Sequence, residues 1–184
     1  MFMRSERLFL RPGWPEDWRD LLDRMADEAV VRNLPTAPWP YGEEHARAWL
    51  AERAEPLLPR LLVTLPGAGG SELVGCVGLH RADDGVELGY WVARSHWGRG
   101  FATEAVRAIL SLARAIGHGR IAAYHFADNP ASGRVLEKLG FRPTGTTGPR
   151  YSLARGSYAP AVGWEIELGD GLDGDGGGPM RLAA

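Results

Sequence analysis

The sequence has a single cysteine, Cys76, among its 184 residues. One cysteine excludes a disulfide within the chain, which suits a reducing compartment, and we therefore expect a cytoplasmic protein. Cys76 lies in the apolar run Leu73–Leu79. That position indicates a small buried hydrophobic residue rather than a catalytic thiol.

Long hydrophobic runs are also absent. No apolar stretch approaches the roughly 20 residues that a membrane-spanning helix needs. The segment Met1–Arg11 is too short and too charged for a signal peptide. The sequence therefore predicts no membrane partner.

The chain has no excess of positive charge. Its formal net charge is -2 and its pI is near 6.2, and the arginines, which far outnumber the lysines, are dispersed among acids. This balance lacks the basic footprint of a nucleic-acid binder, so we expect no nucleic-acid partner. The histidines show no metal-ligand spacing, so no metal is expected; they are His45, His80, His96, His118 and His125.

The composition is that of one ordinary globular domain. Hydrophobic residues make up 45% of the chain and charged residues 24%, and 184 residues suffice to bury a core. The last segment, 169–184, is rich in glycine and aspartate and has few apolar residues. We predict a folded domain over 1–168 and a disordered tail after it.

Hydrophobic periodicity predicts strands and helices in the following order. Strands are expected at Ser5–Pro12, Arg60–Pro66, Glu72–His80, Val86–Val92, Arg120–Phe126, Tyr151–Ala154 and Ala161–Leu168. Helices are expected at Pro15–Ala29, Glu43–Glu55, Phe101–Ile116 and Pro130–Leu139. This order indicates a mixed sheet with helices on both faces.

The junction between the strand at Val86–Val92 and the following helix carries two glycines, Gly98 and Gly100, on either side of Arg99. The first N–H groups of a helix have no partner within it, and the helix dipole is positive there. Glycine lets a ligand approach the backbone because it has no Cβ. Together these features predict an anion site suited to phosphate or diphosphate.

Two common phosphate-binding loops are excluded by named residues. A Walker A loop has a lysine and then Ser or Thr after its last glycine, whereas Gly100 is followed by Phe101. A dinucleotide fingerprint has a third glycine where this sequence has Thr103, and no early βαβ unit leads into it.

A third pattern fits. Trp97-Gly98-Arg99-Gly100-Phe101-Ala102-Thr103-Glu104-Ala105 resembles the acyl-CoA diphosphate loop of the GNAT acetyltransferase superfamily, closest to its RimJ/RimL branch. Trp97 stands where the wider family has Gln or Arg. A second block, Asn129 to Phe141, also matches, with a serine three residues after Asn129 and then Leu-Glu-Lys-Leu-Gly-Phe. The resemblance covers Ser5–Leu168.

The resemblance implies an α/β (α+β) fold: a central mixed, mostly antiparallel sheet of about seven strands, splayed between the fourth and the fifth, with about four helices on both faces. It also implies acetyl-CoA as co-substrate, held without a metal. The implied CoA-binding residues are Trp91, Val92, Ala93, Arg94, Gly98, Arg99, Gly100, Phe101, Ala102, Thr103 and Asn129.

Two residues are catalytic candidates by the same resemblance. Glu87 is an ionisable group in an apolar strand, and we expect burial to raise its pKa toward that of a general base; the alternative is a side chain that points to solvent. Ser132 is the candidate acid for the leaving thiolate, with Tyr124 and Tyr151 as alternatives. His80, at a strand end, fits a surface histidine better than a base.

The acceptor is expected to be an amine. The segment Asn33–Gly42 lines the acceptor cleft in the resembled family, so Trp39 and Tyr41 are candidates for substrate contact or for a plain hydrophobic lid. The leading prediction is an N-acetyltransferase for a protein N-terminal amine. The alternatives are an enzyme for a small amine and a CoA-binding module without turnover; a monomer and a homodimer both stay open.

Overall fold

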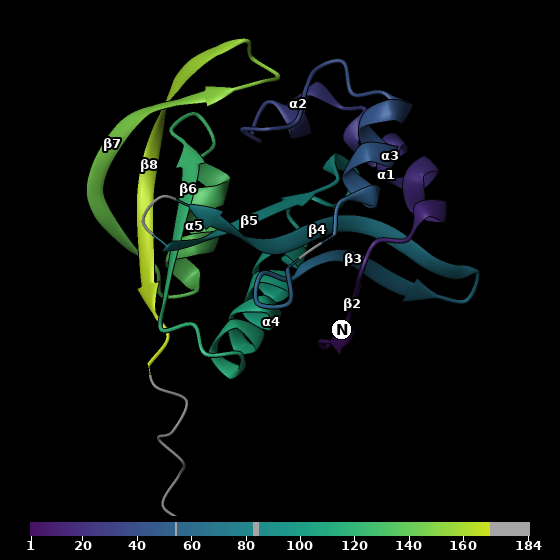
Figure 1. Cartoon of the computed structure of the whole chain (residues 1–184), viewed down its shortest axis with the longest axis horizontal. Coiled ribbons are helices and arrows are strands. Elements are labelled where there is room, and N and C mark those ends of the chain that lie inside the picture. Colours follow the sequence, from purple (N-terminus) through teal and green to yellow (C-terminus); the bar gives the residue numbers. More distant parts are fainter. Residues whose placement is uncertain (54, 83–84, 170–184) are drawn as a thin grey trace, which may run out of the picture.

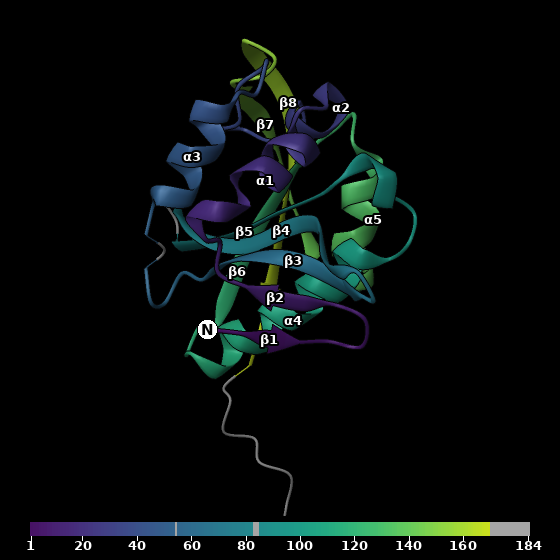
Figure 2. The ribbon, with the colours of Figure 1, turned by 90° about the vertical axis from the view of Figure 1, so that its right-hand side faces the viewer.

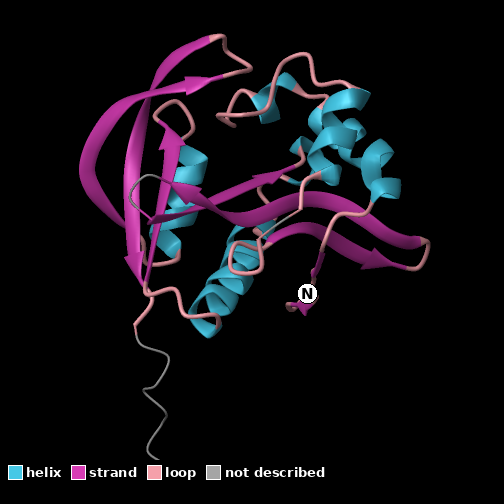
Figure 3. Ribbon diagram, viewed as in Figure 1, coloured by secondary structure: helices cyan, strands magenta, loops and turns pink. Residues whose placement is uncertain are grey.

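A computed structural model describes residues 1–53, 55–82 and 85–169 (Figure 1). The predicted disordered tail lies outside the described residues from 170 onward. Within these ranges, eight strands form one sheet in the order β1-β2-β3-β4-β5-β6-β8-β7. Five α-helices and two short 3-10 helices accompany the sheet (Figure 3).

The strands are β1 (Met3–Arg4), β2 (Phe9–Arg11), β3 (Arg60–Gly67), β4 (Gly70–Ala82), β5 (Gly85–Val92), β6 (Arg120–Phe126), β7 (Arg142–Ser152) and β8 (Ser157–Glu167). The helices are η1 (Pro15–Asp17), α1 (Trp18–Met25), α2 (Glu28–Val31), α3 (Glu43–Ala51), η2 (Arg94–His96), α4 (Phe101–Ala115) and α5 (Pro130–Lys138).

The N-terminal elements are shorter than predicted. Ser5 to Leu8 forms a turn, in which the Ser5 N–H donates to the Leu8 carbonyl, so the first strand becomes β1 and β2. The predicted helix Pro15–Ala29 is interrupted because the Asp27 side chain accepts the Ala29 N–H and starts α2. The helix predicted to reach Glu55 ends at Ala51, since Glu52 is extended.

The C-terminal strand predicted at Tyr151–Ala154 belongs to a longer hairpin. β7 begins at Arg142 and pairs with β8 in antiparallel register from Arg142↔Glu165 to Ser152↔Ser157, with one register shift. Its glycines and prolines made it resemble a loop. They are tolerated because β7 is an edge strand that pairs only with β8.

The sheet divides between β5 and β6. From β1 to β5 neighbouring strands are antiparallel, and β6, β8 and β7 form a second antiparallel group. The two groups meet through a parallel pairing of only Glu87↔Ala122 and Leu88↔Ala123. Beyond these pairs β5 and β6 diverge (Figure 1), as the predicted splay requires.

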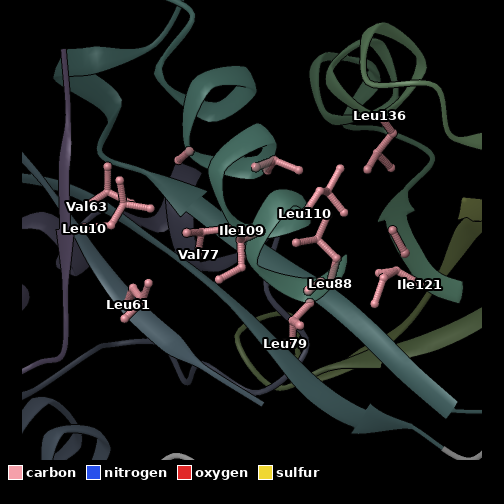
Figure 4. Close-up of a cluster of buried hydrophobic side chains, with 14 of the residues drawn as sticks. Leu10, Leu61, Val63, Val77, Leu79, Leu88, Ile109, Leu110, Ile121 and Leu136 are labelled. Atoms are coloured by element: carbon pink, nitrogen blue, oxygen red, sulfur yellow. The ribbon is translucent and has the colours of Figure 1, made fainter. Parts of the chain in front are cut away.

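Two hydrophobic cores lie on opposite faces of the first strand group, with α1 and α3 on one face and α4 on the other (Figure 2). Side chains of β3 alternate between them: Leu61 and Val63 pack with Ile109 of α4 (Figure 4), whereas Leu62 packs with Leu21 of α1. The alternation of strand side chains therefore decides which helix each residue of β3 packs against.

Cys76 belongs to the core beneath α1 and α3 and is 6% exposed. Burial raises the pKa of its thiol to about 12, and the positive charge of Arg60 offsets only part of this effect. The thiol is therefore protonated and unreactive at neutral pH.

Gly75 allows β4 and β5 to lie unusually close at the C-terminal end of β5. A Cβ on Gly75 would be 2.3 Å from the Trp91 carbonyl oxygen and 3.1 Å from the Val92 Cα. Both of those atoms belong to the backbone and cannot rotate away.

We expect Gly75→Ala to lower the free energy of unfolding by about 1–3 kcal/mol, because strand backbone must shift to admit the methyl group. Gly119→Ala is the control, since no atom lies within 4 Å of the added Cβ; its effect should be within about 0.5 kcal/mol. Urea denaturation measures both. Equal stability of the two variants would contradict the close approach.

Candidate active site

A cavity of about 420 Å³ opens where β5 and β6 part. β5 and β6 line it, together with the loop before α4, the first turn of α4, one face of α5 and a segment of the loop that follows α2. The predicted site residues that line it are Glu87, Trp91, Val92, Gly98, Gly100, Phe101, Ala102, Thr103, Asn129 and Ser132.

The anion loop has the backbone geometry that the glycines require. Gly98 and Gly100 have φ values of 74° and 79°, in the left-handed region that glycine adopts without strain. Gly100 is the N-cap of α4, a helix of 15 residues. In the described part of the chain, the backbone N–H groups of residues 101–103 have no hydrogen-bond acceptor. These donors, at the positive end of the helix, can bind an anion.

An ion pair between the half-exposed Arg7 and the buried Glu104 connects this loop to the N-terminal turn. Glu104, in the first turn of α4, accepts hydrogen bonds from the Ser5 hydroxyl and from the N–H and Nε of Arg7, each at 2.7 Å. Arg7 Nη1 also donates to the Arg99 carbonyl at 3.0 Å, and its guanidinium stacks 4.7 Å from the Phe101 ring centre. Arg7 therefore ties Arg99, between the two glycines, to the first turn of α4.

The Glu104 carboxylate carries negative charge beside a predicted anion site, and Arg7 neutralises it. Burial pushes the pKa of Glu104 upward, but the hydrogen bonds from Arg7 and Ser5 and the charge of Arg7 lower it overall. The sequence prediction missed this pair, because residues 7 and 104 are brought together only by the sheet.

Three predicted CoA-binding residues lie outside the cavity lining. The Ala93 N–H donates to the Val74 carbonyl and its own carbonyl accepts the His96 N–H, both at 2.9 Å, so neither group is available. Arg94 Nη1 is 3.8 Å from Asp27 Oδ2, and Arg94 is not among the residues that line the cavity. Arg99 stacks 4.7 Å from the Phe101 ring centre.

Ser132 lies against Tyr90, which the sequence prediction did not single out. Their hydroxyl oxygens are 2.7 Å apart, and the Tyr90 hydroxyl is also 3.2 Å from the Ser132 carbonyl. Burial raises the pKa of Tyr90 to about 12, and the hydrogen bond with Ser132 offsets part of this. Tyr90 is therefore a neutral phenol that can donate or accept a hydrogen bond.

Asn129 and the residues after it place α5 against the cavity. The Asn129 side chain caps α5 by accepting the Ser132 N–H at 3.4 Å. Ala131, Arg134 and Lys138 share the cavity face with Ser132 and Val135. Their spacing of three and four residues is a helical stripe, so Arg134 and Lys138 were predictable from Ser132.

Glu87 lies inside the protein, with its side chain 6% exposed, and does not point to solvent. Its two carboxylate oxygens each accept a hydrogen bond of 2.8 Å from Arg150 of β7, and His80 Nε2 is 3.4 Å from Oε1. The Arg150 guanidinium stacks 3.7 Å from the Tyr124 ring centre.

The expected rise in the Glu87 pKa is wrong. Burial does push the pKa upward, but hydrogen bonds from His80 and Arg150 and their charges outweigh it, so the pKa lies below the ordinary value. Arg150 is supplied by a hairpin 63 residues further along the chain. No local pattern in the sequence predicts the contact between Arg150 and Glu87.

The structure does not bring Trp39 and Tyr41 to the cavity. Trp39 is 40% exposed outside the lining, and Tyr41 is buried in the core beneath α1 and α3. Asn33, Leu34 and Pro35, from the same loop, line the cavity in their place. Of the alternative acids, Tyr124 lines the cavity, whereas Tyr151 packs edge-on against Tyr158 on the outer hairpin.

The described residues contain neither a metal-binding cluster nor a membrane-spanning helix. Across 1–53, 55–82 and 85–169, no three or more His, Cys, Asp or Glu side chains gather in a way that would hold a metal ion. In the same ranges, every helix is too short or too polar to span a membrane.

Comparisons with known proteins agree with this geometry. A family model described as an acetyltransferase (GNAT) domain matches residues 7–142. YoaA of Bacillus subtilis (strain 168), named as an uncharacterized N-acetyltransferase, is 40% identical over 78 residues, which are 40% of this chain and 44% of YoaA. The alignment thus spans less than half of that relative's length.

Solved structures share the fold over most of the chain. An acetyltransferase (GNAT family) from Bacillus anthracis superposes with a TM-score of 0.78 and 24% identity, over 91% of this chain and 99% of that one. A RimL ribosomal L7/L12 α-N-protein acetyltransferase in complex with coenzyme A superposes with a TM-score of 0.74 and 18% identity, over 91% and 98%.

We expect Glu104→Gln to lower the free energy of unfolding at pH 7 by about 1–3 kcal/mol, because charged hydrogen bonds to Arg7 are lost. The lowered pKa of Glu104 means that its ionised form stabilises the fold above the ordinary value of 4.5. This stabilisation is lost as the pH falls through the folded-state pKa. Denaturation of both proteins from pH 7 to pH 3 should therefore show the difference shrinking, and a constant difference would contradict the charge pairing.

Proposed function

This chain belongs to the GNAT family of acetyltransferases, and we propose that it moves an acetyl group from acetyl-CoA to a primary amine, that of a protein N-terminus. One observation carries the proposal. The unpaired edge of β5 and the unpaired N–H groups of α4 open into the same cavity. An extended thioester ligand with a diphosphate at one end matches this combination.

We assign the diphosphate to the N–H groups of residues 101–103 and the glycine turn before them. The pantetheine arm would then run along β5 beside Trp91 and Val92, in the gap that β6 leaves. Arg134 and Lys138 on the facing side of α5 add positive charge to the cavity wall. Asn129 would cap α5 and would lie beside the pantetheine arm.

The transfer asks the protein to position and polarise rather than to form a covalent intermediate. The amine loses a proton, its nitrogen attacks the thioester carbon, the C–S bond breaks, and the thiolate takes up a proton. Holding the two reactants in attack geometry is worth roughly 7–11 kcal/mol of barrier. Backbone N–H groups of β5 would polarise the carbonyl.

Ser132 and Tyr90 are suited to deliver the proton to the thiolate. Their hydroxyls are 2.7 Å apart, so a proton leaving Ser132 is replaced from Tyr90. Glu87 belongs to the other proton transfer, at the acceptor end beside His80 and Tyr124. Two separate proton-handling groups favour turnover over a CoA-binding module.

The charges of the cavity bear on the acceptor. Glu87 is the single carboxylate among its described lining residues, and Arg150 already pairs with it. A polyamine or aminoglycoside carries several cations and needs several carboxylates, so this cavity favours a monoamine. The RimL structure, of a protein α-N-acetyltransferase, supports the N-terminal amine; an amino acid is the small-molecule alternative.

Thr103→Glu should raise the acetyl-CoA Kd at least about tenfold, because a carboxylate in the first turn of α4 repels a diphosphate. Without bound ligand, a negative charge near the N-terminus of α4 is favourable, so the variant should still fold. Thr103→Gln is the matched control of equal size and should bind within about threefold of wild type. Isothermal titration calorimetry measures both, and unchanged binding in Thr103→Glu would move the diphosphate elsewhere.

Incubation with acetyl-CoA should release thiol in the presence of peptides with a free N-terminal amine, and less with spermidine or kanamycin. N-terminally blocked copies of the same peptides are the control and should give only background. Thiol release with the polyamine and not with any peptide would contradict the proposed acceptor. No release with any amine would contradict turnover.

A further inference from the structure

His80 shares the acceptor end of the cavity with Glu87, and the two come from neighbouring strands. His80 of β4 lies directly opposite Glu87 of β5 in the sheet register. Its side chain is 52% exposed and lines the cavity. The imidazole packs over Gly89, where an added Cβ would be 3.5 Å from Cε1 and 3.6 Å from Nδ1.

Glu87 itself is poorly placed to take a proton from an amine. Both of its oxygens are bound by Arg150, and protonation would break that pair. A carboxylate held in this way is a weak base. Imidazole, in contrast, is the side chain that most often exchanges protons near neutral pH.

On the premise of the proposed function, we infer that His80 is the catalytic base and that Glu87 is its positioning residue. Glu87 Oε1, 3.4 Å from His80 Nε2, orients the ring so that Nδ1 lies over Gly89, beside the free edge of β5. The thioester carbon is delivered along that edge. Arg150, Glu87 and His80 therefore form one chain of contacts, in which Arg150 binds the buried Glu87 and Glu87 contacts His80.

The proton balance is simple. The acceptor ammonium gives one proton to Nδ1 of His80, which becomes imidazolium while the amine nitrogen gains a free electron pair. The Glu87 carboxylate stays ionised throughout and stabilises the imidazolium. After attack the nitrogen gives its second proton to water, and the half-exposed imidazolium also releases its proton to water. Ser132 gives a proton to the thiolate and regains one from water through Tyr90.

The groups that surround the imidazole are few in the described residues. Glu87 of β5 faces Nε2, and Arg150 of β7 lies on the far side of Glu87 above the Tyr124 ring of β6. Arg81, the next residue of β4, is bound by Glu55. Glu87 is thus the charge that directly contacts the ring.

The test compares His80→Gln, Glu87→Gln and the control His118→Gln, with an accepting amine and a range of pH. His118 lies outside the cavity and contacts the Leu57 carbonyl. We expect His80→Gln to lower kcat about 10²–10³-fold and to remove the fall in rate on the acid side. Its acetyl-CoA Kd should stay within about twofold of wild type.

Glu87→Gln should lose less activity, about tenfold, and should keep the acid-side fall in rate, because His80 is still present. Added imidazole should restore part of the rate of His80→Gly and none of that of Glu87→Gln. His118→Gln should behave as wild type.

The outcomes separate the two claims. If wild type binds acetyl-CoA and acetylates an amine, while His80→Gln keeps both its rate and its pH profile, His80 is not the base and the proposed function stands. If Glu87→Gln removes the acid-side fall and His80→Gln does not, Glu87 is the base. If wild type acetylates no amine, the proposed function fails and this inference fails with it.

Discussion

The parting of β5 from β6 is the constraint on which the rest of the site depends. β5 is paired with β4 along its length, and β6 is paired with β8 from Arg120↔Glu167 to Phe126↔Ala161. Each strand is therefore held by its outer neighbour on the side away from the gap. The backbone groups left along the gap need other partners, because unpaired buried N–H and C=O groups are costly. An extended ligand can supply these partners.

Arginines from distant segments hold the carboxylates that surround this gap. Arg7 pairs with Glu104 beside the anion loop, Arg150 with Glu87 at the acceptor end, and Arg155 with Asp128 before α5. Arginine suits this task because its planar guanidinium can bind both oxygens of a carboxylate. Hydrogen bonds from Arg155 and its charge outweigh the effect of burial and lower the pKa of Asp128.

This arrangement gives the cavity its electrostatic character. Each of these carboxylates is paired with an arginine, and Arg134 and Lys138 add positive charge to the cavity wall along α5. The same pairing converts Glu87 from the buried acid of raised pKa that its strand context predicts into a fixed anion. Under the proposed function, the N-terminus of α4 is the anion-binding part of the cavity, and Glu87 with His80 belongs to the proton-handling part.

The splay of the sheet was expected only through the resemblance to the GNAT family. The sequence by itself determined the order of the predicted elements, the glycine turn before α4 and the Asn129 cap of α5. These features follow from local patterns, in which hydrophobic spacing and glycine or capping residues act over a few positions. Only the tertiary structure decided that Arg150 reaches Glu87, that Arg7 braces Glu104, that Ala93 is already bonded, and that Asn33 to Pro35 rather than Trp39 and Tyr41 face the cavity. Each of these contacts joins segments that are far apart in the sequence and that the folded sheet brings together. The residue spacing within either segment therefore cannot predict the contact.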